Sequence, residues 1–156
     1  MIEIAIPDGV TLKIHHLVLD YNGTLAVDGE LITGVLEHLK LLAGSVKIHV
    51  ITADTHGTVR EKVDSIDCLV HVIGEGEQDK QKAEYLNNLG VDSTMAIGNG
   101  RNDTLMLSQA ALGISVIQSE GMSPMAMVAS DICCKNINDA LALLLKPSRI
   151  MATLRN

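Results

Sequence analysis

The sequence predicts an α/β fold in three layers, with a central and mainly parallel sheet. Short apolar segments rich in β-branched residues alternate with longer segments of helical period. Strands that alternate with helices form right-handed βαβ units around a parallel sheet. Polar side chains also follow several of the short segments directly, at the edge where parallel sheets bind their ligands. The chain has 156 residues, so we expect residues 1–156 to form a single domain.

The first half of the chain is expected to begin with a hairpin over residues 2–14 that turns around Asp8. Residues 16–19 are apolar and end at Asp20, which is typical of a buried strand. In residues 31–43 the apolar side chains recur on one helical face. The other elements expected in this half are a strand over 46–51, a helix over 58–64 and a strand over 68–73.

The second half of the chain shows the same alternation of strands and helices. Residues 79–89 are expected to form a helix whose inward face carries Tyr85, Leu86 and Leu89, and Gly90 ends this helix. A strand over residues 94–97 is expected to end at Gly98. The remaining expected elements are a helix over 102–111, strands over 112–117 and 131–134, and a helix over 137–145.

Composition excludes several functional classes. The formal net charge is −7 and only 1% of the residues are aromatic, which argues against a nucleic-acid partner. No apolar run approaches the ~20 residues of a membrane span, so no membrane partner is expected. The three cysteines have no metal-ligand spacing and are interpreted as small apolar residues in a reducing compartment. A cytoplasmic location is therefore predicted.

Asp20 is the first candidate functional residue. It ends a strand and precedes Asn22, Gly23 and Thr24. A carboxylate at this position can attack phosphorus and form an aspartyl-phosphate. Gly23 permits a tight turn of the backbone around the site. Taken alone, the segment is also compatible with an ordinary turn that follows a strand.

Two further positions are suited to holding a phosphoryl group. Thr52 ends the second long strand, so its hydroxyl and the backbone N–H of Ala53 can bind phosphate oxygens. His56, just past Thr52, is a candidate for lining an open site. Lys82 is preferred over Lys80 as the phosphate-binding cation, because it shares the helical face of Leu86.

The segment Gly98-Asn99-Gly100-Arg101-Asn102-Asp103 follows the strand over 94–97 and begins a helix. Its glycines allow the backbone to approach a ligand closely, and Asp103 can face a cation. The third glycine of a dinucleotide-binding fingerprint is missing. The ordered set of Asp, Thr, Lys and Gly-Asn-Gly-x-Asn-Asp is more specific than any one of its parts.

This ordered set resembles the haloacid dehalogenase (HAD) superfamily of phosphotransferases. Within it, the chain looks most like the phosphorylation domain of P-type ATPases and the small soluble P-type ATPase-like proteins. The resemblance runs from about Asp20 to about Leu145 and implies a Rossmann-like HAD fold. It also implies Mg²⁺ held by Asp20, the carbonyl of Asn22 and Asp103, with Asn99 as a neutral contact. Thr52 and the lysine would then bind the phosphoryl group.

The chain departs from the family pattern at two positions. Asn22 stands where family phosphatases carry an aspartate that protonates the leaving group, and an amide cannot do this. Losing such help typically costs ~10²–10⁴ in rate, so turnover is expected to be slow. Asn99 stands where an aspartate is usual, which removes one charge from the metal site.

The intervals between the motifs are short. Only one or two elements of the core fold fit between Asp20 and Thr52, and between Thr52 and Lys82. No cap domain fits there, and neither does the ATP-binding domain of an ion pump. The expected site is therefore open, and its substrate is either a large phosphorylated molecule or a small one covered by a second subunit.

Three functional hypotheses are compatible with the sequence. The first is a HAD-like phosphohydrolase that acts slowly through Asp20 with Mg²⁺. The second is a catalytically impaired phosphate- or Mg²⁺-binding module with a regulatory role, which Asn22 and Asn99 together support. The third is an unrelated α/β binding protein, which a wide separation of the Asp20 and Asp103 carboxylates would favour.

Overall fold

A computed structural model describes residues 1–7, 9–54 and 58–155. Its centre is a sheet of six parallel strands in the order β10-β9-β8-β3-β6-β7. The predicted fold class is confirmed, and this sheet is parallel throughout. Its strands are β3 (His16–Asp20), β6 (Lys47–Thr52), β7 (Cys68–Val72), β8 (Thr94–Gly98), β9 (Leu112–Val116) and β10 (Ile132–Cys134).

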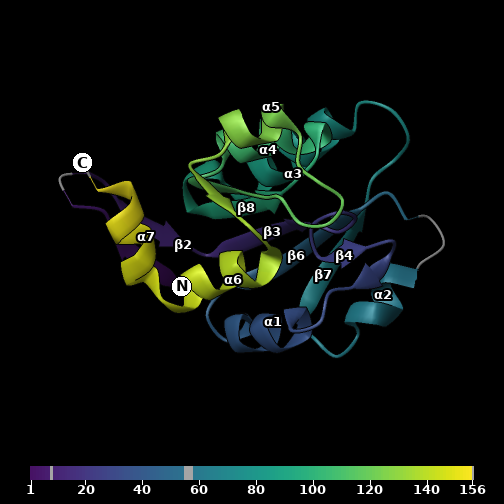
Figure 1. Cartoon of the computed structure of the whole chain (residues 1–156), viewed down its shortest axis with the longest axis horizontal. Helices are drawn as coiled ribbons and strands as arrows, with labels where there is room; N and C mark the ends of the chain where they lie inside the picture. Colours follow the sequence, from purple (N-terminus) through teal and green to yellow (C-terminus); the bar gives the residue numbers. More distant parts are fainter. Residues whose placement is uncertain (8, 55–57, 156) are drawn as a thin grey trace.

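Helices cover both faces of this sheet and give the three layers (Figure 1). One face packs against α1, α2 and α6, and the other packs against α3, α4 and α5. The helices are α1 (Val35–Ala43), α2 (Thr58–Val63), α3 (Gln78–Leu89), α4 (Thr104–Gln109), α5 (Pro124–Ala129) and α6 (Ile137–Leu145).

The central strand β3 shows why these segments form a buried sheet. Leu17 and Leu19 join the core on the α1–α6 side, whereas Val18 joins the core on the α3–α5 side. Side chains alternate between the two faces of a strand, so both faces of β3 must be apolar. All three side chains are fully buried, which contributes roughly 1.5–3 kcal/mol each.

The first helix starts later than the sequence predicts. The expected helix over 31–43 begins at Val35, and Leu31 lies instead in the short strand β5 (Glu30–Leu31). This strand pairs with β4 (Ala26–Val27) in a small hairpin beside the loop that follows Asp20. Gly34 has a φ of 92°, a left-handed conformation that ends the helical path on the N-terminal side. The apolar spacing alone did not reveal this boundary.

Further elements complete the chain around the sheet. The opening hairpin is confirmed as β1 (Ile2–Ala5) paired with β2 (Thr11–Ile14), and Asp8 lies outside the described residues. The final helix α7 (Pro147–Leu154) packs on β1. The short turns η1 (Val91–Ser93) and η2 (Arg101–Asp103) precede β8 and α4, so the helix expected over 102–111 is split. Within the described residues, no helix is long and apolar enough to cross a membrane.

Candidate active site

The carboxyl ends of three neighbouring strands meet at one point of the sheet edge. Asp20 is the last residue of β3, Thr52 the last of β6 and Gly98 the last of β8. Lys82 reaches the same point from α3. These elements enclose a pocket of about 280 Å³. It is lined by Asp20, Asn22, Thr52, Ala53, Ile73, Gln78, Lys82, Asn99, Gly100 and Asn102.

Lys82 joins the two carboxylates of the site. Its Nζ atom lies 2.6 Å from Oδ1 of Asp20 and 2.6 Å from Oδ1 of Asp103. The two carboxylate oxygens are therefore at most twice that distance apart, which argues against an unrelated protein with chance motif matches. Lys82 is buried, as its helical position predicts, whereas Lys80 is exposed and pairs with Glu77.

Asp103 is held from both sides and has no exposed surface. Its Oδ1 atom accepts a hydrogen bond from Lys82, and its Oδ2 atom accepts from the backbone N–H groups of Asn99 and Gly100, at 3.0 and 2.8 Å. A Cβ atom at position 98 would lie 2.5 Å from this carboxyl group, so Gly98 is required for the close approach. Asp103 thus connects the loop after β8 to the position of Lys82.

The loop after β3 is locked against the loop after β8. The Thr24 hydroxyl lies 3.0 Å from Oδ2 of Asp20 and 3.3 Å from Oδ1 of Asn99. Gly23 has a φ of 80°, and a Cβ atom there would lie 2.5 Å from the Asn99 amide nitrogen. The backbone carbonyl of Gly121 accepts from the same amide at 2.9 Å. Glycine at position 23 is therefore needed for both its backbone conformation and its packing.

The other predicted phosphate-binding residues lie on the pocket wall. The Thr52 side chain is buried, and its Oγ1 atom accepts from the backbone N–H of Asp54 at 3.1 Å. Ala53 is exposed beside it, and Asn22 is exposed across the pocket. His56 lies outside the described residues. The structure therefore brings together Asp20, Asn22, Thr52, Ala53, Lys82 and Asn99 around one pocket.

Burial and charge shift the pKa values of the buried pair. Burial, and then the neighbouring charge of Asp103, raise the pKa of Asp20 to about 7, although Lys82 opposes this shift. Burial lowers the pKa of Lys82, but Asp20 and Asp103 outweigh that effect, so its pKa is raised overall. Lys82 therefore stays charged at neutral pH, and one lysine must balance two carboxylates.

The oxygen atoms of the pocket suit a Mg²⁺ ion that keeps several water ligands. Asp20 offers a carboxylate, and Asn22 and Asn99 offer amide or backbone oxygens, which are the hard donors that Mg²⁺ prefers. Asp103, another predicted ligand, accepts hydrogen bonds from Lys82 at Oδ1 and from the backbone N–H of Gly100 at Oδ2, and its contact with a metal stays a prediction. In the described part of the chain, no group of three or more acidic, histidine or cysteine side chains forms a metal cluster.

Gln118 does not line the pocket, but it holds the loop that follows Asp20, and the sequence analysis missed it. Its Nε2 atom donates to the carbonyls of Gly23 and Thr24, at 2.8 and 2.5 Å, and its Oε1 atom accepts from the backbone N–H of Ile137. Its own φ of 49° is uncommon for a residue other than glycine. No local pattern identifies it, because its partners lie far away in the sequence.

Several solved structures share this fold. The cobalt-bound deoxy-D-mannose-octulosonate 8-phosphate phosphatase of Haemophilus influenzae matches with a TM-score of 0.69 and 15% identity, over 92% of this chain and 94% of that one. The 3-deoxy-D-manno-octulosonate 8-phosphate phosphatase of Moraxella catarrhalis, in complex with magnesium ion, phosphate ion and the sugar acid, matches with a TM-score of 0.65 and 20% identity, over 91% and 94%. A phosphoserine phosphatase matches with a TM-score of 0.65 and 16% identity, over 86% and 99%.

These likenesses establish that the chain has the fold of the HAD superfamily hydrolases. No family model matches the sequence. The uncharacterized protein MJ0073 of Methanocaldococcus jannaschii is 53% identical over 62 residues, which cover 40% of this chain and 67% of that protein. The chain belongs to the same family as MJ0073. A second protein of that organism, MJ0072, is 44% identical over 39 residues, or 25% of this chain and 89% of its own length.

Proposed function

We propose that the protein is a Mg²⁺-dependent phosphohydrolase or phosphotransferase that acts through an aspartyl-phosphate at Asp20. The observation that carries this proposal is the contact of the Asp20 carboxylate with Lys82 beside an open pocket at the carboxyl edge of a parallel sheet. Ligands of such sheets bind at this edge. A buried carboxylate beside a cation is also a suitable nucleophile for phosphorus.

The residues of the pocket have complementary roles in the transfer. An oxygen of Asp20 forms a bond to phosphorus, and the ester oxygen leaves with the electron pair of the broken P–O bond. Lys82 offsets the negative charge of Asp20 and of the phosphoryl oxygens. Thr52 and the backbone at Ala53 orient these oxygens, and Asp103 holds Lys82 in place. A Mg²⁺ ion held by Asp20, the carbonyl of Asn22 and Asp103, with Asn99 as a neutral contact, would neutralise further charge on the phosphoryl group.

Asn22 is the reason that we expect slow turnover. The residue lines the pocket and is exposed, so it lies where an acid could reach the leaving oxygen. Its amide has no proton to give and cannot activate water. The aspartyl-phosphate is therefore expected to form more readily than it hydrolyses. P-type ATPases, which the motifs resemble, also lack an acid at this position and form a longer-lived aspartyl-phosphate. We therefore propose the soluble P-type ATPase-like branch for this chain, without any pumping activity.

The test compares the protein with Asp20→Ala in an assay of a generic phosphomonoester with Mg²⁺. The unaltered protein is expected to release phosphate slowly, and Asp20→Ala is expected to release none. Asp92→Ala is the matched control, because Asp92 is exposed on η1, away from the pocket. Mass spectrometry of quenched protein should find a phosphoryl group on Asp20. Equal rates for the unaltered protein and Asp20→Ala would exclude the proposal.

A second candidate function is a phosphate- or Mg²⁺-binding module that has lost turnover. The exposed amide of Asn22 at the pocket supports this alternative. Asn22→Asp separates the two candidates, because it supplies an acid without changing the size of the side chain. A gain of about 10²–10⁴ in hydrolysis identifies a catalytic scaffold that lacks only its acid. The absence of any gain supports the binding role.

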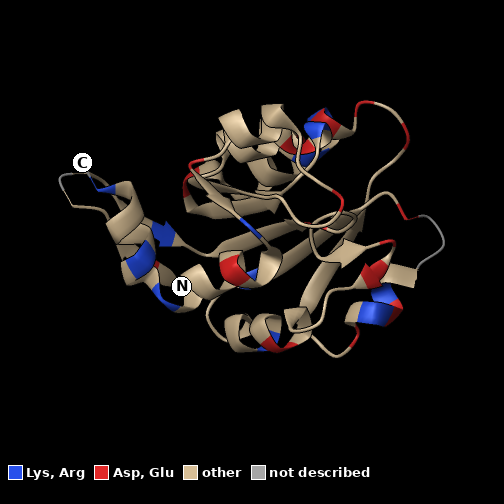
Figure 2. Ribbon diagram, viewed as in Figure 1, with Lys and Arg blue, Asp and Glu red and all other residues tan. Residues whose placement is uncertain are grey.

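The exposed side of the pocket bears on the partners of the protein. Asn22 and Ala53 are exposed at the pocket, so we propose a phosphorylated molecule that is either large or covered by a second copy of the chain. Lys and Arg segments are scattered over the helical layers in Figure 2 instead of forming one band. This distribution supports the proposal that nucleic acid is not a partner. Light scattering with and without a phosphate ligand measures whether copies associate.

A further inference from the structure

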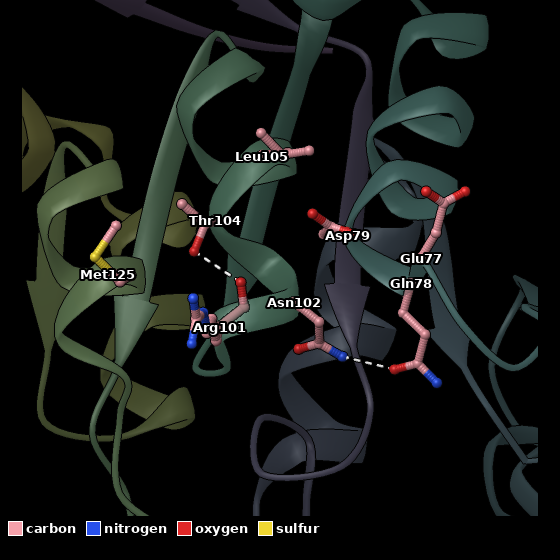
Figure 3. Close-up of a pocket in the computed structure, with 8 residues that line it drawn as sticks. All are labelled: Glu77, Gln78, Asp79, Arg101, Asn102, Thr104, Leu105 and Met125. Atoms are coloured by element: carbon pink, nitrogen blue, oxygen red, sulfur yellow. Dashed lines mark hydrogen bonds between the residues drawn. The ribbon is translucent and has the colours of Figure 1, made fainter.

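A second pocket, of about 470 Å³, opens beside the pocket over Asp20. It lies between the start of α3, the η2–α4 segment and α5 (Figure 3). Its volume is within the range of ligand sites for small molecules. None of the residues predicted from the motifs as catalytic or phosphate-binding belongs to its wall, so this pocket lies outside the predicted phosphoryl-binding site.

Two side chains form a shared wall between this pocket and the pocket over Asp20. Gln78 and Asn102 line both pockets. The Asn102 Nδ2 atom donates to Oε1 of Gln78 at 3.0 Å, so a polar pair spans from α3 to η2 (Figure 3). The two pockets are thus neighbours, and a substrate whose phosphoryl group lies at Asp20 would extend past this pair to place its alcohol portion in the second pocket. The amides of the shared wall are suited to binding hydroxyl groups along the way.

Arg101 is the cation of the second pocket. It is exposed, and no salt bridge joins its guanidinium to an acid in the described residues. The hydrogen bond from Thr104 uses only the backbone carbonyl of Arg101 (Figure 3). The guanidinium is therefore available to a ligand anion, and its two parallel donors match a carboxylate.

The remaining groups restrict the ligand further. Glu77 on the α3 side is already neutralised by Lys80, whereas Asp79 lies on the same side with its carboxylate toward the pocket (Figure 3). Leu105 and the half-exposed Met125 supply apolar surface. A small molecule with one anionic group, several polar groups and a short carbon chain therefore fits these walls.

We infer that the second pocket holds the alcohol portion of a phosphomonoester that carries a carboxylate, and that Arg101 binds this carboxylate. The inference rests on the proposed phosphoryl transfer at Asp20. A hydroxy acid phosphate and an amino acid phosphate share the required chemistry. Asp79 would favour the amino acid, because its carboxylate can pair with an ammonium group.

The test uses two matched pairs of phosphomonoesters with Mg²⁺. The first pair is 3-phosphoglycerate and glycerol 3-phosphate, and the second is O-phosphoserine and phosphoethanolamine. Each pair differs mainly in the carboxylate. The unaltered protein is expected to prefer the carboxylate-bearing member by about ten- to a hundredfold in kcat/KM, the size of a charge-assisted contact. Arg101→Gln should bring this ratio close to one, while Arg149→Gln on α7 should leave it unchanged.

A binding measurement separates this inference from the proposed function. Asp20→Asn cannot form the aspartyl-phosphate, so calorimetry with this variant reports binding of the same four compounds without turnover. Preferential binding of the carboxylates that Arg101→Gln abolishes supports the subsite even if no hydrolysis occurs. Hydrolysis of both members of each pair at equal kcat/KM would overturn the subsite and leave the proposed function standing. Equal binding of all four compounds by Asp20→Asn would also overturn it.

Discussion

The ammonium group of Lys82 lies 2.6 Å from a carboxylate oxygen of Asp103, and neither side chain is more than 2% exposed. The same ammonium contacts Asp20 at the same distance. Asp103 also closes the loop after β8 through two backbone N–H groups. One buried cation therefore connects three segments of the chain, and the site and the stability of the fold depend on it together.

The first prediction concerns the loss of this cation. Lys82→Met leaves two buried carboxylates without a counter-charge, so the free energy of unfolding at pH 8 should fall by about 3–5 kcal/mol. Lys80→Met is the matched control, because Lys80 is on the same helix and exposed. Urea denaturation of both variants measures the difference. A loss for Lys82→Met no larger than that for Lys80→Met would show that the bridge contributes nothing.

The second prediction follows from the raised pKa of Asp20. A carboxyl group whose pKa is about 7 in the folded protein, above its ordinary value near 4, binds its proton more tightly in the folded state. The stability from this group is therefore fully present below pH 4 and is lost as the pH rises from about 4 to about 7. Asp20→Asn removes the free-energy cost of the ionised carboxylate. At pH 8 its Tm should therefore exceed that of the unaltered protein by about 2–4 °C for each kcal/mol of that cost.

Asp20→Asn has two controls, a measurement at low pH and a measurement with Mg²⁺. At pH 4 the difference in Tm should vanish, because Asp20 is then protonated in the folded protein. At pH 8, Mg²⁺ should raise the Tm of the unaltered protein more than that of Asp20→Asn, since the carboxylate is a proposed ligand. A lower Tm for Asp20→Asn at pH 8 would mean that the charge of Asp20 stabilises the fold.

The third prediction concerns Gln118, which holds the carbonyls of Gly23 and Thr24. Gln118→Glu replaces the donating NH₂ group by an oxygen that faces two carbonyl oxygens. The rate of phosphate release should fall at least about tenfold, and Tm should fall as well, because each buried unpaired group costs about 1–3 kcal/mol. Gln109→Glu on the exposed end of α4 is the control. An unchanged rate for Gln118→Glu would show that the loop holds its conformation without this contact.

The fourth prediction concerns His49, which is buried between His16 and Tyr85. Burial, and then the charges of His16 and Lys47, lower its pKa to about 4. The folded state therefore keeps His49 neutral while the unfolded state gains a proton below pH 6.5. Stability from this residue is present above pH 6.5 and should fall by up to about 3 kcal/mol as the pH decreases to 4.

The measurement is urea denaturation at several pH values between 7 and 4. His49→Gln should show a shallower loss over this range than the unaltered protein, and His15→Gln, at an exposed position, should not. The comparison between variants matters because Asp20 changes stability in the opposite direction over part of the same range. Parallel curves for His49→Gln and the unaltered protein would contradict the prediction.

The elements that carry the site were predictable from the sequence because their signals are local. Asp20, Thr52 and Gly98 follow apolar runs directly, and the ends of parallel strands meet at one edge. The choice between Lys80 and Lys82 needed only the helical period, since Lys82 and Leu86 share a face. Fold class and the positions of these residues therefore followed from patterns within a few residues of each side chain.

The parts that escaped prediction have two different causes. Helix α5 did carry a local signal: Ser123 accepts from the N–H of Met125 as an N-cap, and Pro124 occupies the first turn. The contacts of Gln118 carried none, because they depend on how the chain between β9 and β10 returns to the loop after β3. Contacts of that kind become visible only when the packing is known.

The strand order has a consequence for biosynthesis. β3 pairs on one side with β8, as His16 opposite Thr94, so the strand that carries Asp20 is synthesised long before this neighbour. Until β8 arrives, one edge of β3 offers unpaired backbone groups that can recruit other chains. Such long-range pairing also slows folding. The nascent protein thus exposes this edge to aggregation until residue 98 has left the ribosome, and ligand binding at Asp20 reports on chains in which β3 has paired with β8.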